Sequence, residues 1–157
     1  MGADGPSSSV GSPAGHWGPG SPGPRIPRRN PPLRTCSAWT RRTVNAFIER
    51  LQNPRGTETY FSVKARLAEG EVVEPMWLEK IRFDGVQFHG AVSNDPEDLR
   101  HVTLGSPWSV APAEISDWMI IDSGRLAGGQ TIRVLRRRMP PDGREEFDAR
   151  ANLIISD

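Results

Sequence analysis

Apolar and polar residues alternate without a break from Tyr60 to Leu67. Phe61, Val63, Ala65 and Leu67 occupy one side of the pattern, while tyrosine, serine, lysine and arginine occupy the other. Because successive side chains of a strand point to opposite faces of its sheet, this period of two predicts a half-buried strand.

Two further strands are predicted on either side of Asp84-Gly85. An Asp-Gly pair between apolar segments is a strong signal for a two-residue hairpin turn. The strand before the turn runs from about Glu74 to Phe83, and the strand after it runs from Val86 to Val92. With Asp84 and Gly85 as the loop, Phe83 lies opposite Val86, which fixes the pairing of the whole hairpin.

This register assigns the side chains of the hairpin to two faces. Trp77 falls opposite Val92, on the same face as Phe83. That face is aromatic and aliphatic with one carboxylate in it, and it contains Trp77, Glu79, Ile81, Phe83, Val86, Phe88, Gly90 and Val92. We therefore expect Trp77, Ile81 and Phe88 to share the hydrophobic interior.

Two amphipathic helices are predicted, one before and one after these strands. Thr40 is a candidate N-cap for the first helix, which ends at Asn53-Pro54 because a residue before proline is disfavoured in helical conformation. Its apolar residues recur at helical spacing, at Val44, Phe47, Ile48 and Leu51. Thr131 is the candidate cap of the second helix, which extends to Met139 and stops at two prolines.

Shorter elements are predicted between and after these segments. Asp95 and Pro96 favour a short helical turn, since they suit the cap and the first position of a helix. Residues 108–110 form a short edge strand, and residues 115–122 form a longer one that ends at a Ser-Gly turn. Residues 145–150 are expected to add one more helical turn.

These elements predict a single α+β domain over residues 35–157. About five strands form a strongly bent antiparallel sheet, or a partly open barrel, flanked by the N-terminal and C-terminal helices. Residues 1–34 contain 7 Gly, 8 Pro and 5 Ser, and too few large apolar residues to offset the entropy lost on ordering. We expect a disordered Pro/Gly/Ser-rich basic tail, although proline-rich segments also bind aromatic grooves.

The net charge of +1 comes from the tail. Residues 1–34 hold four arginines and one aspartate, a net of +3, so residues 35–157 hold 16 basic and 18 acidic residues, a net of −2. A nucleic-acid-binding domain normally has a basic balance. Cys36 is the only cysteine, no run reaches the roughly 18 apolar residues of a membrane span, and no signal peptide is recognisable, so a cytoplasmic protein is expected.

Five short motifs follow one another along the domain, namely Glu74-x-Met76-Trp77-Leu78, Gly90-x-x-x-Asn94-x-Pro96, Gly105, Ile115-Ser116-Asp117-Trp118-Met119 and Gly128-Gly129-x-Thr131-Ile132-Arg133. Their order and spacing resemble the YegJ-like family, the domain-of-unknown-function family numbered 2314, over roughly residues 61–149. Pro75 stands where that family commonly has histidine, and Gln130 where it commonly has an aromatic residue, so no role of that histidine applies to this chain. The resemblance implies a compact α+β domain found mainly in bacteria, and it implies no reaction.

Three carboxylates are candidates for catalysis, namely Glu74, Glu79 and Asp117. Two carboxylates held close together can divide the roles of acid and base, which keeps a hydrolase-like enzyme as an alternative. Glu79 on an apolar face would need a partner, for which Arg133 and the indole N–H of Trp118 are candidates. An ion pair or a strand-end cap is the simpler interpretation of each carboxylate.

Other catalytic signatures are missing from the sequence. It has no cysteine and histidine spacing typical of a metal site, no nucleophile elbow and no phosphate-binding loop, so we expect no metal and no cofactor. His89 falls on the polar strand face, where a solvated histidine is expected. Arginines between Arg133 and Arg138 form a basic helix, which keeps a weak nucleic-acid binder as a second alternative.

Binding is the function that the sequence favours. Tryptophan is enriched at the anchor points of interfaces, and Trp108 is the best candidate for exposure. Trp118, Asn94 and Arg133 complete the predicted binding residues. We therefore expect a non-catalytic module that binds an unidentified protein partner, with neither a membrane nor a nucleic acid as its target.

Overall fold

The computed structural model describes the backbone of residues 33–156 and the side chains of residues 38–156, so the predicted tail lies almost wholly outside the described residues. The elements follow in this order, with a short 3-10 turn, η2 (Pro112–Glu114), before β5: α1 (Leu33–Gln52), β1 (Glu58–Glu69), β2 (Val72–Phe83), β3 (Phe88–Val92), β4 (Pro107–Val110), β5 (Ile115–Asp122), β6 (Arg125–Gly128), α2 (Gln130–Arg138) and α3 (Pro141–Ala151).

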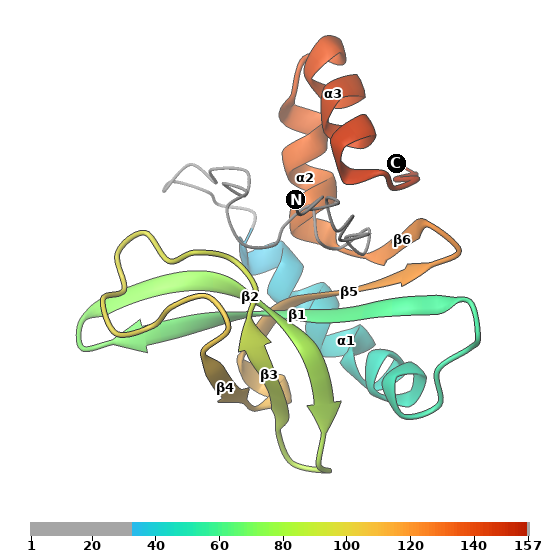
Figure 1. Cartoon of the computed structure of the whole chain (residues 1–157). Helices are drawn as coiled ribbons and strands as arrows, with labels where there is room; N and C mark the ends of the chain where they lie inside the picture. The colour runs from blue at the N-terminus through green and yellow to red at the C-terminus, as the bar shows by residue number, and fades with distance from the viewer. Residues whose placement is uncertain (1–32, 157) are drawn as a thin grey trace, which may run out of the picture.

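All six strands form one antiparallel sheet in the order β4-β3-β2-β1-β5-β6. β4 and β6 lie at the two ends, so the sheet is open and does not close into a barrel. Figure 1 shows β3 running nearly across the direction of β1, with α1 behind the sheet and α2 and α3 at its β5–β6 end. The predicted α+β class, with a bent antiparallel sheet and flanking helices, is confirmed.

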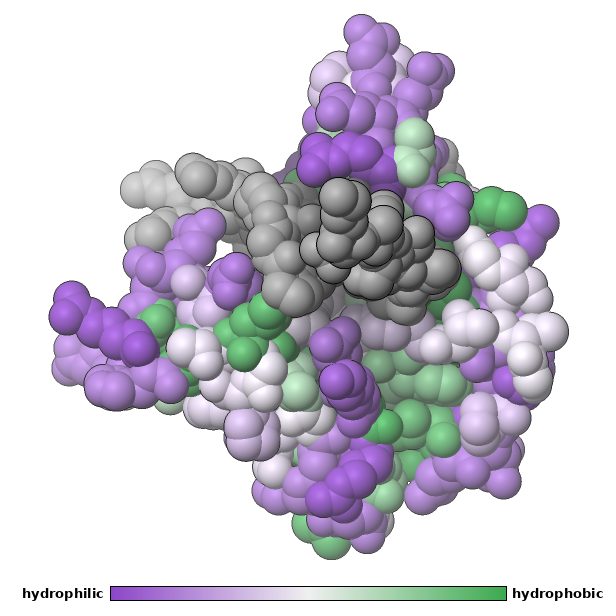
Figure 2. Space-filling view, viewed as in Figure 1, coloured by the Kyte–Doolittle hydropathy of each residue, from purple (hydrophilic) through white to green (hydrophobic). Residues whose placement is uncertain are grey.

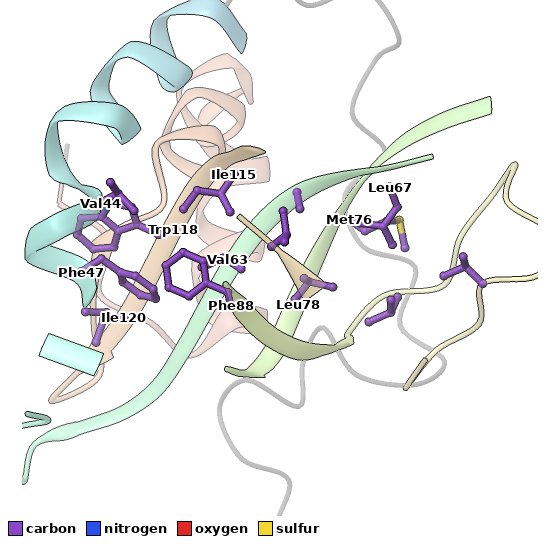
Figure 3. Close-up of a cluster of buried hydrophobic side chains, with 14 of the residues drawn as sticks. Val44, Phe47, Val63, Leu67, Met76, Leu78, Phe88, Ile115, Trp118 and Ile120 are labelled. Carbon is purple, nitrogen blue, oxygen red and sulfur yellow. The ribbon is translucent and has the colours of Figure 1, made fainter. Parts of the chain in front are cut away.

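α1 packs on one face of the sheet, where the larger hydrophobic core lies (Figure 3). Phe47 is fully buried in this core, and its ring centroid lies 5.8 Å from that of Phe88 and 5.2 Å from that of Trp118. A second core lies on the opposite face against α2, α3 and the C-terminal segment, and contains Met119, Ile121, Leu126, Ile132, Ala151, Leu153 and Ile155. The β5 end of the sheet is therefore covered on both faces.

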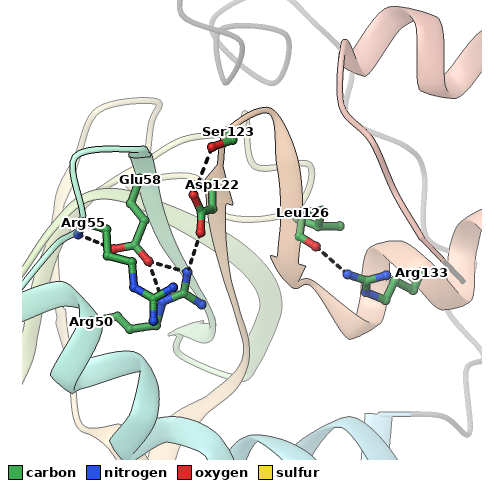
Figure 4. Close-up of polar contacts among 7 residues, drawn as sticks. All are labelled: Arg50, Arg55, Glu58, Asp122, Ser123, Leu126 and Arg133. Atoms are coloured by element: carbon green, nitrogen blue, oxygen red, sulfur yellow. Dashed lines mark hydrogen bonds and ion pairs between the residues drawn. The ribbon is translucent and has the colours of Figure 1, made fainter.

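A charged contact fixes the C-terminal end of α1 to the sheet (Figure 4). The Nε of Arg50 donates to Glu58 at 2.6 Å, and its Nη2 donates to Asp122 at 3.3 Å. Glu58 also accepts from the backbone N–H of Arg55 at 2.8 Å. Because Glu58 begins β1 and Asp122 ends β5, a single guanidinium holds both strand ends against the helix.

The predicted register of the β2–β3 hairpin is wrong. Phe83 pairs with Phe88, so residues 84–87 form a four-residue loop in place of the expected two-residue turn. The Asp84 carboxylate accepts from the backbone N–H groups of Val86 and Gln87, both at 2.8 Å. The side chain of Asp84 thus stabilises a longer loop, which an Asp-Gly pair alone does not distinguish from a tight turn.

A β-bulge in β2 changes the faces as well. Lys80 and Ile81 lie together opposite Gly90, and Lys80 adopts a positive φ of 54°. The alternation therefore reverses at the bulge. Ile81 joins the α1 core as expected, whereas Trp77 faces the other side. Met76 and Leu78, both fully buried, take the position that Trp77 was expected to fill.

The two predicted amphipathic helices begin elsewhere than expected. α1 begins at Leu33, and Thr40 lies inside it, where its hydroxyl donates to the carbonyl of Ser116 at 2.9 Å. α2 begins at Gln130 after a left-handed Gly129, and the side chain of Thr131 does not cap it. In both cases a threonine that looked like a cap makes a tertiary contact.

The short elements differ in part. The expected helical turn at Asp95 and Pro96 does not form, and these residues belong to an extended loop between β3 and β4. β6 was not predicted, because four residues ending at Gly128 show no period. Residues 145–150 form part of the longer helix α3. The strand expected over residues 115–122 is confirmed as β5.

Gly128 cannot be replaced without moving β5. Its φ is 72°, and a Cβ atom there would lie 2.7 Å from the Trp118 ring. We predict that Gly128→Ala lowers the free energy of unfolding by about 3 kcal/mol, through overpacking and an unfavourable φ. Gly56→Ala is the matched control, since nothing lies within 4 Å of its added Cβ, and should change stability by less than about 0.5 kcal/mol. Chemical denaturation measures both, and equal stabilities of the two variants would contradict this packing.

Candidate functional site

Polar side chains are buried on the sheet face opposite α1. Ser62 is fully buried and Lys64 is 1% exposed, although both belong to the polar side of the β1 alternation. Lys64 pairs with Trp77 on β2 and with Asp117 on β5. Since cross-strand partners share a face, these three side chains cross three adjacent strands in one line.

The Lys64 ammonium lies against an aromatic ring. Its Nζ is 5.6 Å from the centroid of the Trp77 ring, within the range of a cation–π interaction. Burying an ammonium group costs free energy that an apolar side chain would not cost. A strand that served only to hold the sheet together would carry an apolar residue here, so Lys64 marks a candidate functional site.

Tyr60 and Glu79 lie on the same face. The Tyr60 hydroxyl interacts with Ser62, Ser93 and Glu79. Burial, and after it the negative charge of Glu79, raises the pKa of Tyr60 to about 12. Its phenol therefore stays neutral over the physiological range and keeps its hydrogen-bond donor. We call Tyr60, Ser62, Lys64, Trp77 and Glu79 the polar row.

Asp117 borders the polar row but has a structural role. Its carboxylate accepts from the backbone N–H groups of Trp118, Gln130 and Thr131 and from the Thr131 hydroxyl, at 2.7–3.1 Å. It thereby caps the first turn of α2 from a neighbouring strand. Burial raises the pKa of Asp117, and these four donors oppose that shift.

Glu74 also has a structural role, at the edge of the loop between β3 and β4. Its carboxylate accepts from the backbone N–H groups of Glu97 and Asp98 at 2.9–3.1 Å. Glu69 holds the next part of this loop, through the N–H groups of Arg100 and His101. Hydrogen bonds from the backbone N–H and the ring of His101, and from the N–H of Arg100, lower the pKa of Glu69.

The three candidate catalytic carboxylates do not share one point. Glu74 pairs with the buried core residue Leu67, so it belongs to the face that α1 covers. Glu79 and Asp117 lie on the opposite face. Glu79 pairs with Ala91, not with Gly90. The indole N–H of Trp118, one of its expected partners, donates to Thr43 at 2.9 Å.

The predicted binding residues mostly hold the scaffold together. Trp118 is buried and stacks on Trp39 at 5.0 Å between centroids. Asn94 accepts from the backbone N–H of Trp77 at 3.0 Å. Trp108 is partly buried against the α1 core. Arg133 donates to the carbonyl of Leu126 at 2.6 Å (Figure 4). It also donates to the carbonyls of Gly128, at 2.8 Å, and of Ser156.

The basic side of α2 is partly neutralised. Arg136 forms a bidentate pair with Asp148 of α3, with both hydrogen bonds at 2.8 Å. Arg133 is directed to backbone carbonyls, as described above. At least two of the four arginines on this helix are therefore engaged within the domain.

The sequence pattern identified the polar row only as one side of a strand. Alternation shows which side chains share a face, but it does not show that Ser62 and Lys64 are covered. One signal was present: Lys64 and Lys80 are the only lysines in a chain that otherwise uses arginine. Among residues 38–156 no group of three or more metal-binding side chains comes together. None of the helices described has an apolar stretch long enough to cross a lipid bilayer.

The family described as "Uncharacterized protein conserved in bacteria (DUF2314)" matches residues 30–154, and the chain belongs to this family. It is 32% identical over 114 residues to the uncharacterized protein YegJ of Escherichia coli (strain K12), covering 73% of this chain and 72% of the relative. It is 37% identical over 89 residues to a putative ankyrin repeat protein of Neisseria meningitidis serogroup B, covering 57% of this chain and only 35% of that relative. No solved structure matches the chain. The resemblance inferred from the motifs is thus confirmed.

We predict that Glu74→Ala loosens the loop between β3 and β4. Losing the carboxylate leaves the N–H groups of Glu97 and Asp98 without their acceptor, which should lower the free energy of unfolding by about 1 kcal/mol. Hydrogen exchange should speed up at these two amides. Glu71→Ala, an exposed change in the β1–β2 turn, is the control. Unchanged exchange at both amides would contradict the anchoring role.

Tyr60 is the only tyrosine, so phenolate absorbance reports it alone. We predict a native titration midpoint near pH 12, against about 10 for the chain in denaturant. The pKa of Tyr60 is higher in the folded chain than in the unfolded one. The contribution of the neutral phenol to the free energy of unfolding is therefore complete below pH 10, and it is lost as the pH rises from 10 through 12.

Glu79→Gln should lower the midpoint, because it removes the charge, but should leave it above 10, because burial remains. A native midpoint equal to that of the denatured chain would show that Tyr60 is not enclosed in the polar row.

Proposed function

We propose that this domain is a protein-binding module that recognises an acidic segment of its partner through the polar row. The observation that carries the proposal is the partly buried Trp77 ring beside the buried ammonium of Lys64. Neither side chain is needed there to fill the α1 core, since Met76 and Leu78 fill it from the other face of β2.

The composition of the row supports a role in binding. The residues that dominate binding energy are most often tryptophan, tyrosine and arginine, set in places from which water is largely excluded. Trp77 and Tyr60 are both partly buried and lie on one face. Figure 2 shows the surface from the same side as Figure 1, with apolar areas bordered by hydrophilic ones.

The charges of this face favour an acidic partner. Arg66 is exposed two residues after Lys64 on β1, and Arg82 is exposed on β2 opposite His89. Of the acidic groups on the face, Asp117 is turned to the start of α2 by four hydrogen bonds. Glu79 is the one acidic member of the polar row, and Asp84 contacts His89 beside Arg82. The three cations Lys64, Arg66 and Arg82 outnumber these two carboxylates.

The relatives are consistent with a binding role. One of them is named a putative ankyrin repeat protein, and this chain spans about a third of its length. Ankyrin repeats form extended stacked surfaces that bind other molecules. One relative of this domain is therefore named for a class of protein that binds other molecules.

The two alternative functions have less support. A hydrolase built on Glu74, Glu79 and Asp117 would need them at one point, and Glu74 lies across the sheet from the other two. A nucleic-acid binder would need the arginines of α2 at the surface, and Arg136 is paired with Asp148.

The test is affinity capture from a bacterial lysate with the tagged full chain, followed by binding measurements with the purified partner. We expect Trp77→Ala to weaken binding by about 30-fold, the loss typical of a dominant interface residue. Arg66→Glu should weaken it by at least about tenfold and leave the melting temperature unchanged, because Arg66 is exposed.

Arg42→Glu is the matched control, since it makes the same charge reversal on the exposed side of α1. Equal binding by Arg66→Glu and Arg42→Glu would rule out the polar row as the binding surface, and failure of a folded wild-type chain to capture any partner would count against the function itself.

A further inference from the structure

A serine, a histidine and an aspartate form a hydrogen-bonded line beside the β2–β3 loop. The Nδ1 of His89 on β3 lies 2.7 Å from the Oγ of Ser109 on β4, and its Nε2 lies 2.6 Å from the Oδ2 of Asp84. His89 and Ser109 are direct cross-strand partners, so the sheet itself sets their separation. Solvent reaches the line, because the Ser109 residue and the Asp84 side chain are exposed.

The aspartate is held in the orientation that this line requires. One oxygen of Asp84 accepts from the N–H groups of Val86 and Gln87, which leaves the other oxygen for His89. The hydrogen bond from the Gln87 N–H, followed by that from His89, lowers the pKa of Asp84 strongly, so the group stays ionised. An ionised carboxylate can only accept, so the proton of a neutral His89 resides on Nε2. Its Nδ1 lone pair then faces the hydroxyl of Ser109.

We propose that Ser109 is a nucleophile activated by His89, and that the domain hydrolyses small, unhindered carboxylic esters at this exposed site. A nucleophile bonded to a base that a third group orients is the arrangement needed for acyl transfer. This activity goes beyond the proposed binding function and does not depend on it, because it uses none of the residues of the polar row.

The reaction balances in two stages. His89 Nδ1 takes the proton of Ser109 while Oγ bonds to the ester carbonyl carbon, and the leaving alcohol departs with that proton as the ester C–O bond breaks. A water molecule then bonds to the acyl carbon while His89 takes one of its protons, and the bond from that carbon to Ser109 Oγ breaks as His89 returns the proton to Oγ. The products are a carboxylic acid, an alcohol and the unchanged serine.

Arg82 is placed to stabilise the negatively charged oxygen that forms when Ser109 attacks the ester carbonyl. It is the cross-strand partner of His89 on β2, and its side chain is exposed on the same face. A guanidinium near a developing oxyanion stabilises it, although less in water than in a closed pocket. We therefore assign most of the rate gain to His89, since a positioned base contributes roughly 10²- to 10⁴-fold.

The test is covalent labelling of the full chain with a fluorophosphonate probe, located by mass spectrometry. Attack by Ser109 forms an O–P bond and releases fluoride, so we expect one label per chain at Ser109. Ser109→Ala should abolish labelling, and His89→Asn should slow it by at least about 100-fold. Hydrolysis of p-nitrophenyl acetate by the same variants should change in parallel.

Asp84→Asn separates positioning from folding. An asparagine can keep its oxygen on the Val86 and Gln87 amides, and it then offers N–H to His89 in place of a carboxylate oxygen. The imidazole proton should move to Nδ1, which removes the base from Ser109. Labelling should fall at least about tenfold with an unchanged melting temperature, and histidine nitrogen NMR should report the change of tautomer.

Two controls match the active groups. His101 also faces a carboxylate, that of Glu69, so His101→Asn removes an equivalent pair away from Ser109. Ser123→Ala removes an exposed serine beside Asp122. Both should label as the wild type does. Absence of any label on folded wild-type chain, or labelling of Ser109 at the wild-type rate in His89→Asn, would overturn the proposal. Either result would leave the partner-binding test unaffected.

Discussion

The β-bulge at Lys80 and Ile81 is the constraint on which the arrangement of this domain depends. Before the bulge, Trp77 and Glu79 point away from α1, and after it, Ile81 and Phe83 point toward α1. One extra residue in β2 thus lets a single strand supply both a hydrophobic core and a polar face. Gly90 makes this possible, because a Cβ atom there would lie 2.8 Å from the Glu79 carbonyl oxygen.

The motifs that identify the family mostly describe this scaffold. Asp117 caps α2 from β5, Gly128 lies against Trp118, and Arg133 binds the carbonyls at the end of β6. Each of these contacts joins two neighbouring segments of the fold. None of them brings reactive groups together into a reaction centre. A shared fold therefore does not carry a shared reaction, and function has to be argued from the faces that the scaffold presents.

The sequence predicted what local periodicity controls and missed what tertiary contacts control. The apolar side of β1 follows from alternation, and the end of β5 follows from the Ser-Gly turn after it. The loop after Phe83 does not, because the Asp84 side chain can stabilise either a tight turn or a four-residue loop. The start of α2 is likewise set by Asp117, a residue 13 positions away from Gln130, which no local cap rule detects.

The candidate site was harder to predict than the fold for a related reason. Alternation placed Lys64 on the polar side of its strand but gave no sign that the ammonium is buried beside Trp77. His89 looked like a solvated side chain until the pairing of β3 with β4 brought Ser109 to it. The Lys64–Trp77 pair and the His89–Ser109 pair both lie on the sheet face opposite α1. The extra residue in β2 interrupts the ladder of hydrogen bonds, and it leaves the two pairs at different places on that one face. A regular β2 would place Trp77 in the core with Phe83, and the polar row would lose the ring against which its ammonium lies.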